Sequence, residues 1–224
     1  MNPMLQVQPV NLHMGQQVLR GGAPLAKARA ALVLIHGRGA SADDIYSLGE
    51  EVSAGIPGVA LLAPQAAGHS WYPERFFAPL AQNEPYLGSA LGIMAGLVDE
   101  SARGGVGFER IMLIGFSQGA CLSQEFAARN PRRYGAVVGL SGALIGPPGT
   151  PRKLAGSLEA TPVYLGCSDR DAHIPLSSVH ESARILEELG ARVTKTIFAG
   201  MGHTVNAEEI AAVKEMVRAM AAGV

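Results

Sequence analysis

IMLIGFSQGA, residues 111–120, is the stretch that decides the fold. Its first residues are apolar and predict a buried strand, while the residues behind it, QGACLSQEFAARN (118–130), have the pattern of a helix. Gly115 and Gly119 stand two positions either side of Ser117, in the arrangement G-x-S-x-G. A sharp strand-to-helix turn needs small residues there, and it presents the serine hydroxyl beside a helix N-terminus. The alternative is a plain tight turn, but this context favours a nucleophile.

The rest of the chain alternates short apolar runs with longer amphipathic segments. This order predicts a mostly parallel, doubly wound α/β sheet with helices on both faces, because nearly continuous apolar strands are typical of sheets covered on both sides. The expected strands are 31–37, 58–65, 110–116, 134–142, 161–169 and, near an edge, 191–200. The expected helices are 41–54, 83–102, 118–129, 177–189 and 206–221, with Asn83, Ser177 and Asn206 as N-caps and Glu209 completing a capping box.

Composition excludes several classes of protein. The 224 residues are 48% hydrophobic and 17% charged, which fits one domain, residues 1–224, with a large core and no disorder signature. With 18 basic and 19 acidic residues there is no electrostatic reason to expect nucleic acid as a partner. Cys121 and Cys167 are too few for a disulfide framework. The N-terminal stretch lacks the basic and apolar regions of a signal peptide, and no run is long enough for a membrane span, so we expect a cytoplasmic protein.

Two irregular stretches follow strand ends, where ligands bind in open α/β sheets. One is residues 66–86, which holds Trp71, Tyr72, Phe76 and Phe77 in a chain that is only 5% aromatic. These side chains either form the wall of a substrate pocket or only cover the edge of the sheet. The other stretch, 142–156, is rich in glycine and proline. Neither is long enough to be a large cap domain.

A serine nucleophile needs a histidine base and an acid, and in this kind of fold they follow the serine in the order acid, histidine. His203 lies in a glycine-rich loop between the last strand and the last helix, which makes it the expected base. The acid comes from SDRDAHIP (168–175), directly after a strand. Asp169 and Asp171 both satisfy the order, and the residues alone do not separate them.

LIHGRGAS, GFSQGA, LSG at 140–142, SDRDAHIP and GMGHT occur in this order along the chain. Together they resemble the phospholipase/carboxylesterase family of α/β-hydrolases, which includes the acyl-protein thioesterases. The resemblance implies an α/β-hydrolase fold, Asp171 as the acid, and an oxyanion hole formed by the backbone N–H groups of Arg38 and Gln118. It implies hydrolysis of carboxylic esters or thioesters through an acyl-enzyme on Ser117, with no cofactor and no metal. From the loop sizes we expect small to medium acyl chains.

The side chain of Arg38 departs from the thioesterase pattern, where an aliphatic residue is usual. It either meets an anionic group of the substrate or forms a salt bridge to Asp43 or Asp44, and we favour the salt bridge. Cys121 is expected to point away from the nucleophile and to pack in the core.

Two other functions are considered. Gly37-x-Gly39-x-x-Ala42 mimics a dinucleotide-binding fingerprint, but the next strand ends in LLAPQ, without the required carboxylate. A non-catalytic binding protein on the same fold is the remaining alternative, although the serine, acid and histidine positions are all filled. A homodimer is compatible with the sequence.

Overall fold

A computed structural model describes residues 11–152 and 155–223. A seven-stranded sheet runs through them, in the order β1-β3-β2-β4-β5-β6-β7. The first strand pairs with β3 in the antiparallel direction, and every other pair is parallel. The strands are β1 (Val18–Gly22), β2 (Ala30–Ile35), β3 (Val59–Pro64), β4 (Ile111–Phe116), β5 (Ala136–Leu140), β6 (Pro162–Ser168) and β7 (Arg192–Phe198).

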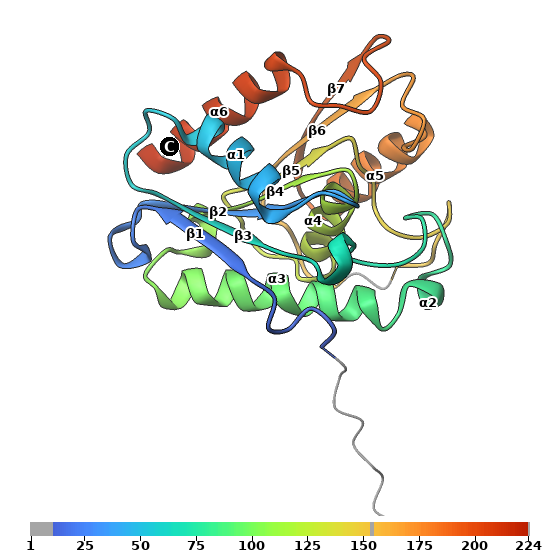
Figure 1. Ribbon diagram of the computed structural model, residues 1–224. Helices are drawn as coiled ribbons and strands as arrows, with labels where there is room; N and C mark the ends of the chain where they lie inside the picture. The colour runs from blue at the N-terminus through green and yellow to red at the C-terminus, as the bar shows by residue number, and fades with distance from the viewer. Residues whose placement is uncertain (1–10, 153–154, 224) are drawn as a thin grey trace, which may run out of the picture.

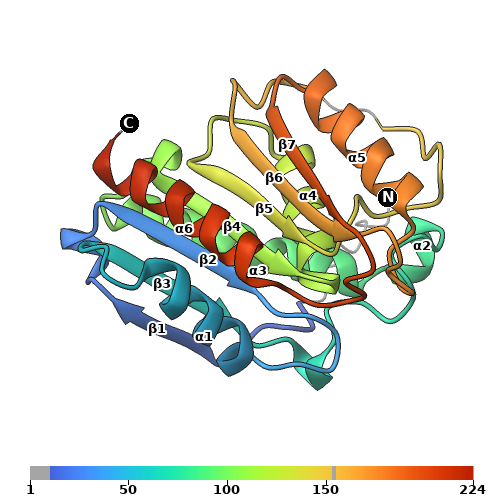
Figure 2. The same cartoon turned by 90° about the horizontal axis from the view of Figure 1, so that it is seen from above.

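Helices cover both faces of the sheet, as the apolar strands predicted. The longer ones are α1 (Ala42–Ser53), α3 (Tyr86–Arg103), α4 (Gln118–Arg129), α5 (Leu176–Glu188) and α6 (Ala207–Ala222), and α2 (Leu80–Asn83) is a single turn. One core lies between the sheet and helices α1 and α6, and the other between the sheet and helices α3, α4 and α5. In Figure 2 helices α1 and α6 lie in front of the strands, and in Figure 1 helix α3 runs along the opposite face. The predicted α/β architecture is confirmed.

Three local details differ from the sequence prediction. The antiparallel edge strand β1 was not predicted, because its five residues VLRGG are half exposed and lack an apolar run. Asn83 does not cap α3: it ends α2, and its side chain accepts from Glu74 N at 2.9 Å and donates to Arg75 O at 3.3 Å. Ser177 lies inside α5, which begins one residue earlier behind Pro175. Pro175 is the N-cap of this helix, and no side chain caps it.

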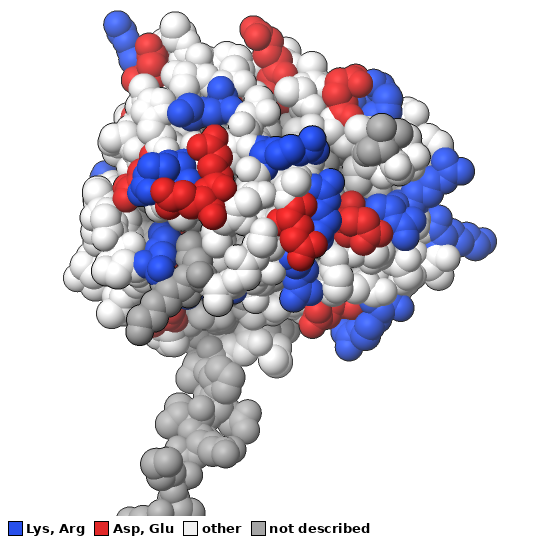
Figure 3. Space-filling view, turned by 180° about the vertical axis from the view of Figure 1, so that it is seen from behind, with Lys and Arg blue, Asp and Glu red and all other residues white. Residues whose placement is uncertain are grey.

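Other predicted details hold. The capping box of Asn206 and Glu209 is present at the start of α6, with reciprocal bonds of 2.9 Å. The strand β7 lies at the edge of the sheet. In the part of the chain that the structure describes, no helix combines the length and the apolar character that crossing a membrane requires. Basic and acidic side chains mingle on the face seen in Figure 3, in keeping with the balanced net charge.

Candidate active site

Ser117 occupies the sharp turn between β4 and α4. Its backbone has φ 54° and ψ −118°, a strained conformation for a residue with a side chain, and its N–H donates to Leu140 O at 2.9 Å. Both flanking glycines are required by close packing. A Cβ on Gly115 would lie 2.2 Å from the carbonyl of Gly119, and a Cβ on Gly119 would lie 2.0 Å from Ile35 O. The G-x-S-x-G spacing therefore lets the helix start directly against the strand ends.

The histidine and the acid predicted from the sequence both reach this turn. His203 lies in the loop between β7 and α6, and its Nε2 is 2.8 Å from Ser117 Oγ. Its Nδ1 is 2.7 Å from Asp171 Oδ2. The hydroxyl, the imidazole and the carboxylate thus form one hydrogen-bonded chain, which is the arrangement that transfers a serine proton to a histidine.

The environments of the two candidate acids differ. Asp171 is fixed by the backbone N–H groups of His173 and Ile174, which donate to its Oδ1 at 2.8 Å and 3.0 Å. Burial favours the neutral form of Asp171, but the hydrogen bonds from His203 and from these two N–H groups outweigh it and hold the pKa of Asp171 below its usual value. Asp169 accepts instead from Gly200 N at 2.7 Å and stabilises the turn after β7. The structure therefore brings Asp171, and not Asp169, to the imidazole.

The two predicted oxyanion donors lie at the same place. Arg38 follows β2, and Gln118 is the first residue of α4; both line the cavity that contains Ser117. Within residues 11–152 and 155–223, neither backbone N–H has a hydrogen-bond acceptor. A helix N-terminus and an adjacent unpaired N–H are the donors that an oxyanion requires.

The guanidinium of Arg38 does not form the salt bridge that we favoured. Among the described residues it has no carboxylate partner, because Asp44 is engaged in a capping box with Ser41 at the start of α1. It donates instead to two carbonyl groups, Pro73 O at 2.6 Å and Glu74 O. Both belong to the stretch 66–86, which we call the aromatic loop. This contact has no signal in the sequence, since every residue carries a backbone acceptor.

The cavity next to Ser117 has a volume of about 470 Å³. Of the four aromatic residues expected to form its wall, Tyr72 and Phe76 line it, while Trp71 and Phe77 do not. Trp71 is fully buried and donates from Nε1 to His36 O at 2.9 Å. Phe77 is 37% exposed. The aromatic loop therefore contributes both to the cavity and to the scaffold beneath it.

Among the residues that the sequence did not place in the site, Cys121 and His173 also line this cavity. Cys121 stands one helical turn after Ser117 and faces the same side, although we had expected it to point away. It is buried, which raises the pKa of its thiol to about 12, so the thiol stays protonated. The ring of His173 lies edge-on to that of His203, with centroids 4.7 Å apart. The i, i+4 spacing of Cys121 and Ser117 was the available signal.

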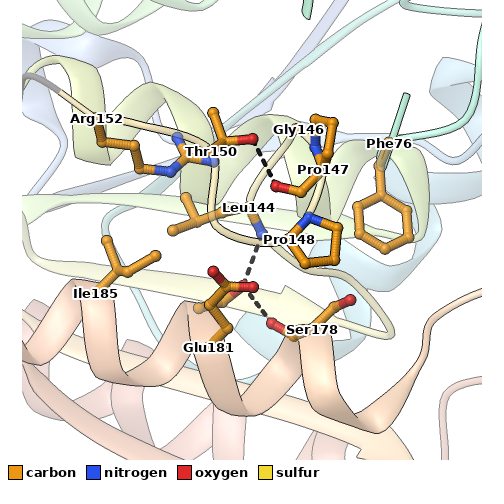
Figure 4. Close-up of a pocket in the computed structure, with 11 residues that line it drawn as sticks. Phe76, Leu144, Gly146, Pro147, Pro148, Thr150, Arg152, Ser178, Glu181 and Ile185 are labelled. Atoms are coloured by element: carbon orange, nitrogen blue, oxygen red, sulfur yellow. Dashed lines mark hydrogen bonds between the residues drawn. The ribbon is translucent and has the colours of Figure 1, made fainter. Parts of the chain in front are cut away.

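Residues 142–152 of the second irregular stretch are tied to the protein core. Glu125 of α4 is buried and accepts from Arg152 at 2.8 Å, from Arg129 at 2.7 Å and from Ile145 N at 3.0 Å. Figure 4 shows the small hollow that this stretch forms with α5 and Phe76, with a volume of about 10 Å³. That is room for about one water molecule. The stretch therefore lines a separate small hollow, which shares Phe76 with the cavity next to Ser117.

Comparison with known proteins agrees with this geometry. The family model described as phospholipase/carboxylesterase matches residues 22–221. A solved phospholipase/carboxylesterase from Dyadobacter fermentans is 38% identical, with a TM-score of 0.87, and the match covers 94% of this chain and 99% of that one. Esterase PE8 is 26% identical with a TM-score of 0.73, covering 92% of this chain and 98% of that one.

The chain is also 30% identical to acyl-protein thioesterase 1 of Gibberella zeae over 128 residues, which are 54% of this chain. The match spans about half of that curated relative, 53% of its length. These relatives support the expected carboxylesterase or thioesterase type of hydrolase, and they confirm the α/β-hydrolase fold. The chain belongs to the phospholipase/carboxylesterase family, as its sequence predicted.

Proposed function

We propose that this protein is a serine hydrolase that cleaves carboxylic esters, or thioesters, of small to medium acyl chains. The observation that supports this most directly is the chain of two short contacts, Ser117 Oγ to His203 Nε2 at 2.8 Å and His203 Nδ1 to Asp171 Oδ2 at 2.7 Å. It opens into a cavity of about 470 Å³, which is the size of a small-molecule site.

In the proposed mechanism Ser117 Oγ attacks the carbonyl carbon while its proton passes to His203 Nε2. Asp171 accepts the Nδ1–H of the imidazole and stabilises the positive charge that forms on it. The backbone N–H groups of Arg38 and Gln118 bind the oxyanion. The intermediate collapses, His203 protonates the departing alcohol or thiol, and the acyl group stays on Ser117. Water, deprotonated by His203, then attacks the acyl-enzyme and releases the acid.

The dinucleotide alternative has no support at the start of α1. There the N–H of Ala42 donates to the side-chain oxygen of Gln65 at 2.8 Å, and Ser41 and Asp44 cap the helix reciprocally. The groups that would hold a pyrophosphate are therefore already satisfied. Gln65, directly after β3, also stands where the ribose-binding carboxylate would be needed.

The test of this function is turnover of p-nitrophenyl butyrate, together with labelling by a fluorophosphonate that reacts with activated serines. We expect burst kinetics and a mass increase on one residue, Ser117. Removal of a triad serine costs on the order of 10⁶ in kcat. A Ser117→Ala variant that keeps more than a few per cent of the activity would refute the assignment, and a protein that turns over no ester would favour the non-catalytic alternative.

The remaining expectations belong to the same proposal. We propose that residues 1–224 act as one catalytic domain, because one sheet connects all the described strands. We place the protein in the cytoplasm, because Cys121 and Cys167 are both free and buried. A homodimer, the absence of a cofactor and the absence of nucleic acid as a partner stay predictions.

A further inference from the structure

The backbone of residues 71–74 in the aromatic loop binds the side chains of both proposed oxyanion donors, besides those of His13, Ser70 and Asn83. Gln118 accepts from Trp71 N at 2.8 Å and donates to Tyr72 O at 2.8 Å. Arg38 donates to Pro73 O at 2.6 Å and to Glu74 O. Each of these four consecutive residues contributes one backbone group. Gln118 binds the groups of the first two residues, and Arg38 binds those of the last two.

This segment is itself anchored where β2 ends. Trp71 is fully buried, its Nε1 donates to His36 O at 2.9 Å, and its carbonyl contacts His13 Nε2 at 3.0 Å. Residues 71–74 therefore connect the loop after β2, which contains Arg38, with the N-terminus of α4, which contains Gln118. We call residues 71–74 the brace.

The brace matters because the two donors stand on different elements. Gln118 N–H belongs to a helix whose first turn is fixed by close packing against Ile35. Arg38 N–H belongs to the loop between β2 and α1, where the neighbouring Gly39 N–H donates to His69 O at 2.7 Å. Oxyanion donors act only when they lie about 2.7–3.1 Å from the developing charge, and a misplacement of about 1 Å can cost a hundredfold in rate.

We propose that the side chains of Arg38 and Gln118 are positioning groups that, through the brace, set the separation of their own backbone N–H groups. This inference rests on the proposed function and gives the side chains of these two residues a positioning role that needs no contact with the substrate. A planar guanidinium fork suits two neighbouring carbonyl oxygens, and a carboxamide suits one donor and one acceptor. Neither role is open to an aliphatic side chain.

The test compares Arg38→Met, Arg38→Lys, Gln118→Met and the double Met variant. Arg75→Met is the matched control, because Arg75 belongs to the same loop and carries the same charge. Its guanidinium stacks on the ring of Phe77 at 5.7 Å and makes no hydrogen bond within the described residues. Rates on neutral p-nitrophenyl butyrate are divided by the number of sites that a fluorophosphonate titrates, so misfolded protein does not count.

We expect each single Met variant to lower kcat by about 10- to 100-fold with KM changed by less than about threefold, because the donors are displaced and not removed. The inhibition constant of an alkyl trifluoromethyl ketone, whose adduct with the serine carries an oxyanion, should rise by a similar factor. Arg38→Lys has one ammonium in place of the guanidinium fork, so its kcat should fall between those of the native protein and Arg38→Met. The double variant should lose less than the product of the single losses, since both side chains hold the same brace.

Several results would overturn this inference. If Arg75→Met lowers kcat as much as Arg38→Met, the effect belongs to the charge at the cavity mouth. If Arg38→Met leaves kcat on the neutral ester unchanged but raises KM for mono-p-nitrophenyl glutarate, the guanidinium binds substrate and does not position the N–H. Native protein that neither takes the label nor turns over ester would overturn the proposed function and this inference together. Labelled, active native protein with unimpaired variants would overturn this inference alone.

Discussion

Phe76 lies between the substrate cavity and the hollow formed by residues 144–152. Its side chain is 6% exposed, and it lines both the 470 Å³ cavity and the 10 Å³ hollow. In Figure 4 its ring stands beside Pro148 and Ser178, at the end of the hollow. We therefore expect Phe76→Ala to join the two spaces and to lengthen the acyl chain that the enzyme accepts.

The size of the effect follows from the burial of methylene groups. Each buried CH₂ contributes about 0.8 kcal/mol, which is about a fourfold gain in kcat/KM per added carbon until the pocket is full. In the native protein we expect the gain to stop at or below about eight carbons, the limit set by the Phe76 ring. Removal of the ring should leave space for at least two more carbons. For an ester two carbons longer than the native limit, kcat/KM should therefore rise by about 15-fold relative to the native enzyme.

The measurement is kcat/KM for p-nitrophenyl esters from acetate to palmitate, each below its micelle concentration. Truncation of a buried phenylalanine costs about 3–5 kcal/mol of unfolding free energy, so the assay is run well below the measured Tm, and Phe76→Leu provides a milder variant. Phe77→Ala is the control, because Phe77 is exposed and does not line the cavity. An unchanged chain-length profile in Phe76→Ala, or an equal shift in the control, would refute this account of the pocket, as would a native profile that climbs steadily to sixteen carbons.

Three further predictions concern carboxylates. Asp171→Asn should lower kcat by about 10⁴-fold, because an amide stabilises the wrong imidazole tautomer, while Asp169→Asn should affect mainly stability; steady-state kinetics of both variants would reverse the assignment if the larger loss fell at Asp169. Burial raises the pKa of Glu209, although the Asn206 N–H opposes it, so the folded protein holds this proton above the unfolded value of 4.5. The native free energy of unfolding should therefore fall, relative to Glu209→Gln, as pH rises through 4.5 toward the higher folded pKa, and parallel urea titrations across pH would contradict this if the difference stayed constant. Glu125→Gln should cost about 3–5 kcal/mol of unfolding free energy, since it leaves the guanidinium of Arg152, 11% exposed, without its charge partner; a loss below about 1 kcal/mol would show that the pair is not needed.

The parts of the site that the sequence predicted are those where chain order restricts the choice. Ser117 stands between two glycines that only close packing explains, and His203 follows the last strand in a loop that must end at the same sheet edge. Parallel strands bring such loops together whatever the details of their side chains. The strand-to-helix turn at Ser117 and the loop of His203 were therefore predictable from the sequence alone. Chain order did not separate Asp169 from Asp171, because two residues so close in a turn both lie near the sheet edge; the preference for Asp171 came from the family resemblance alone.

The parts that the sequence did not predict depend on contacts with backbone groups or on exposure. The edge strand β1 lacks an apolar pattern because its residues are only partly buried or exposed. The salt bridge expected for Arg38 was wrong because nearby acids in the sequence, such as Asp44, can prefer a helix cap over a cation. Side chains that bind carbonyl oxygens leave no trace in composition, since every residue carries that acceptor.

Because contacts with backbone groups leave no trace in the sequence, the sequence predicted only a pocket wall or a cover for the aromatic loop, which also contains the brace. Its aromatic residues drew attention because they are rare in this chain, yet Trp71 faces the protein core and the backbone of residues 71–74 makes the contacts with Arg38 and Gln118. In our proposal, one part of this loop lines the substrate cavity and another positions the oxyanion donors, which couples specificity to rate. Substitutions in the loop that reshape the pocket would then change kcat as well as chain-length preference.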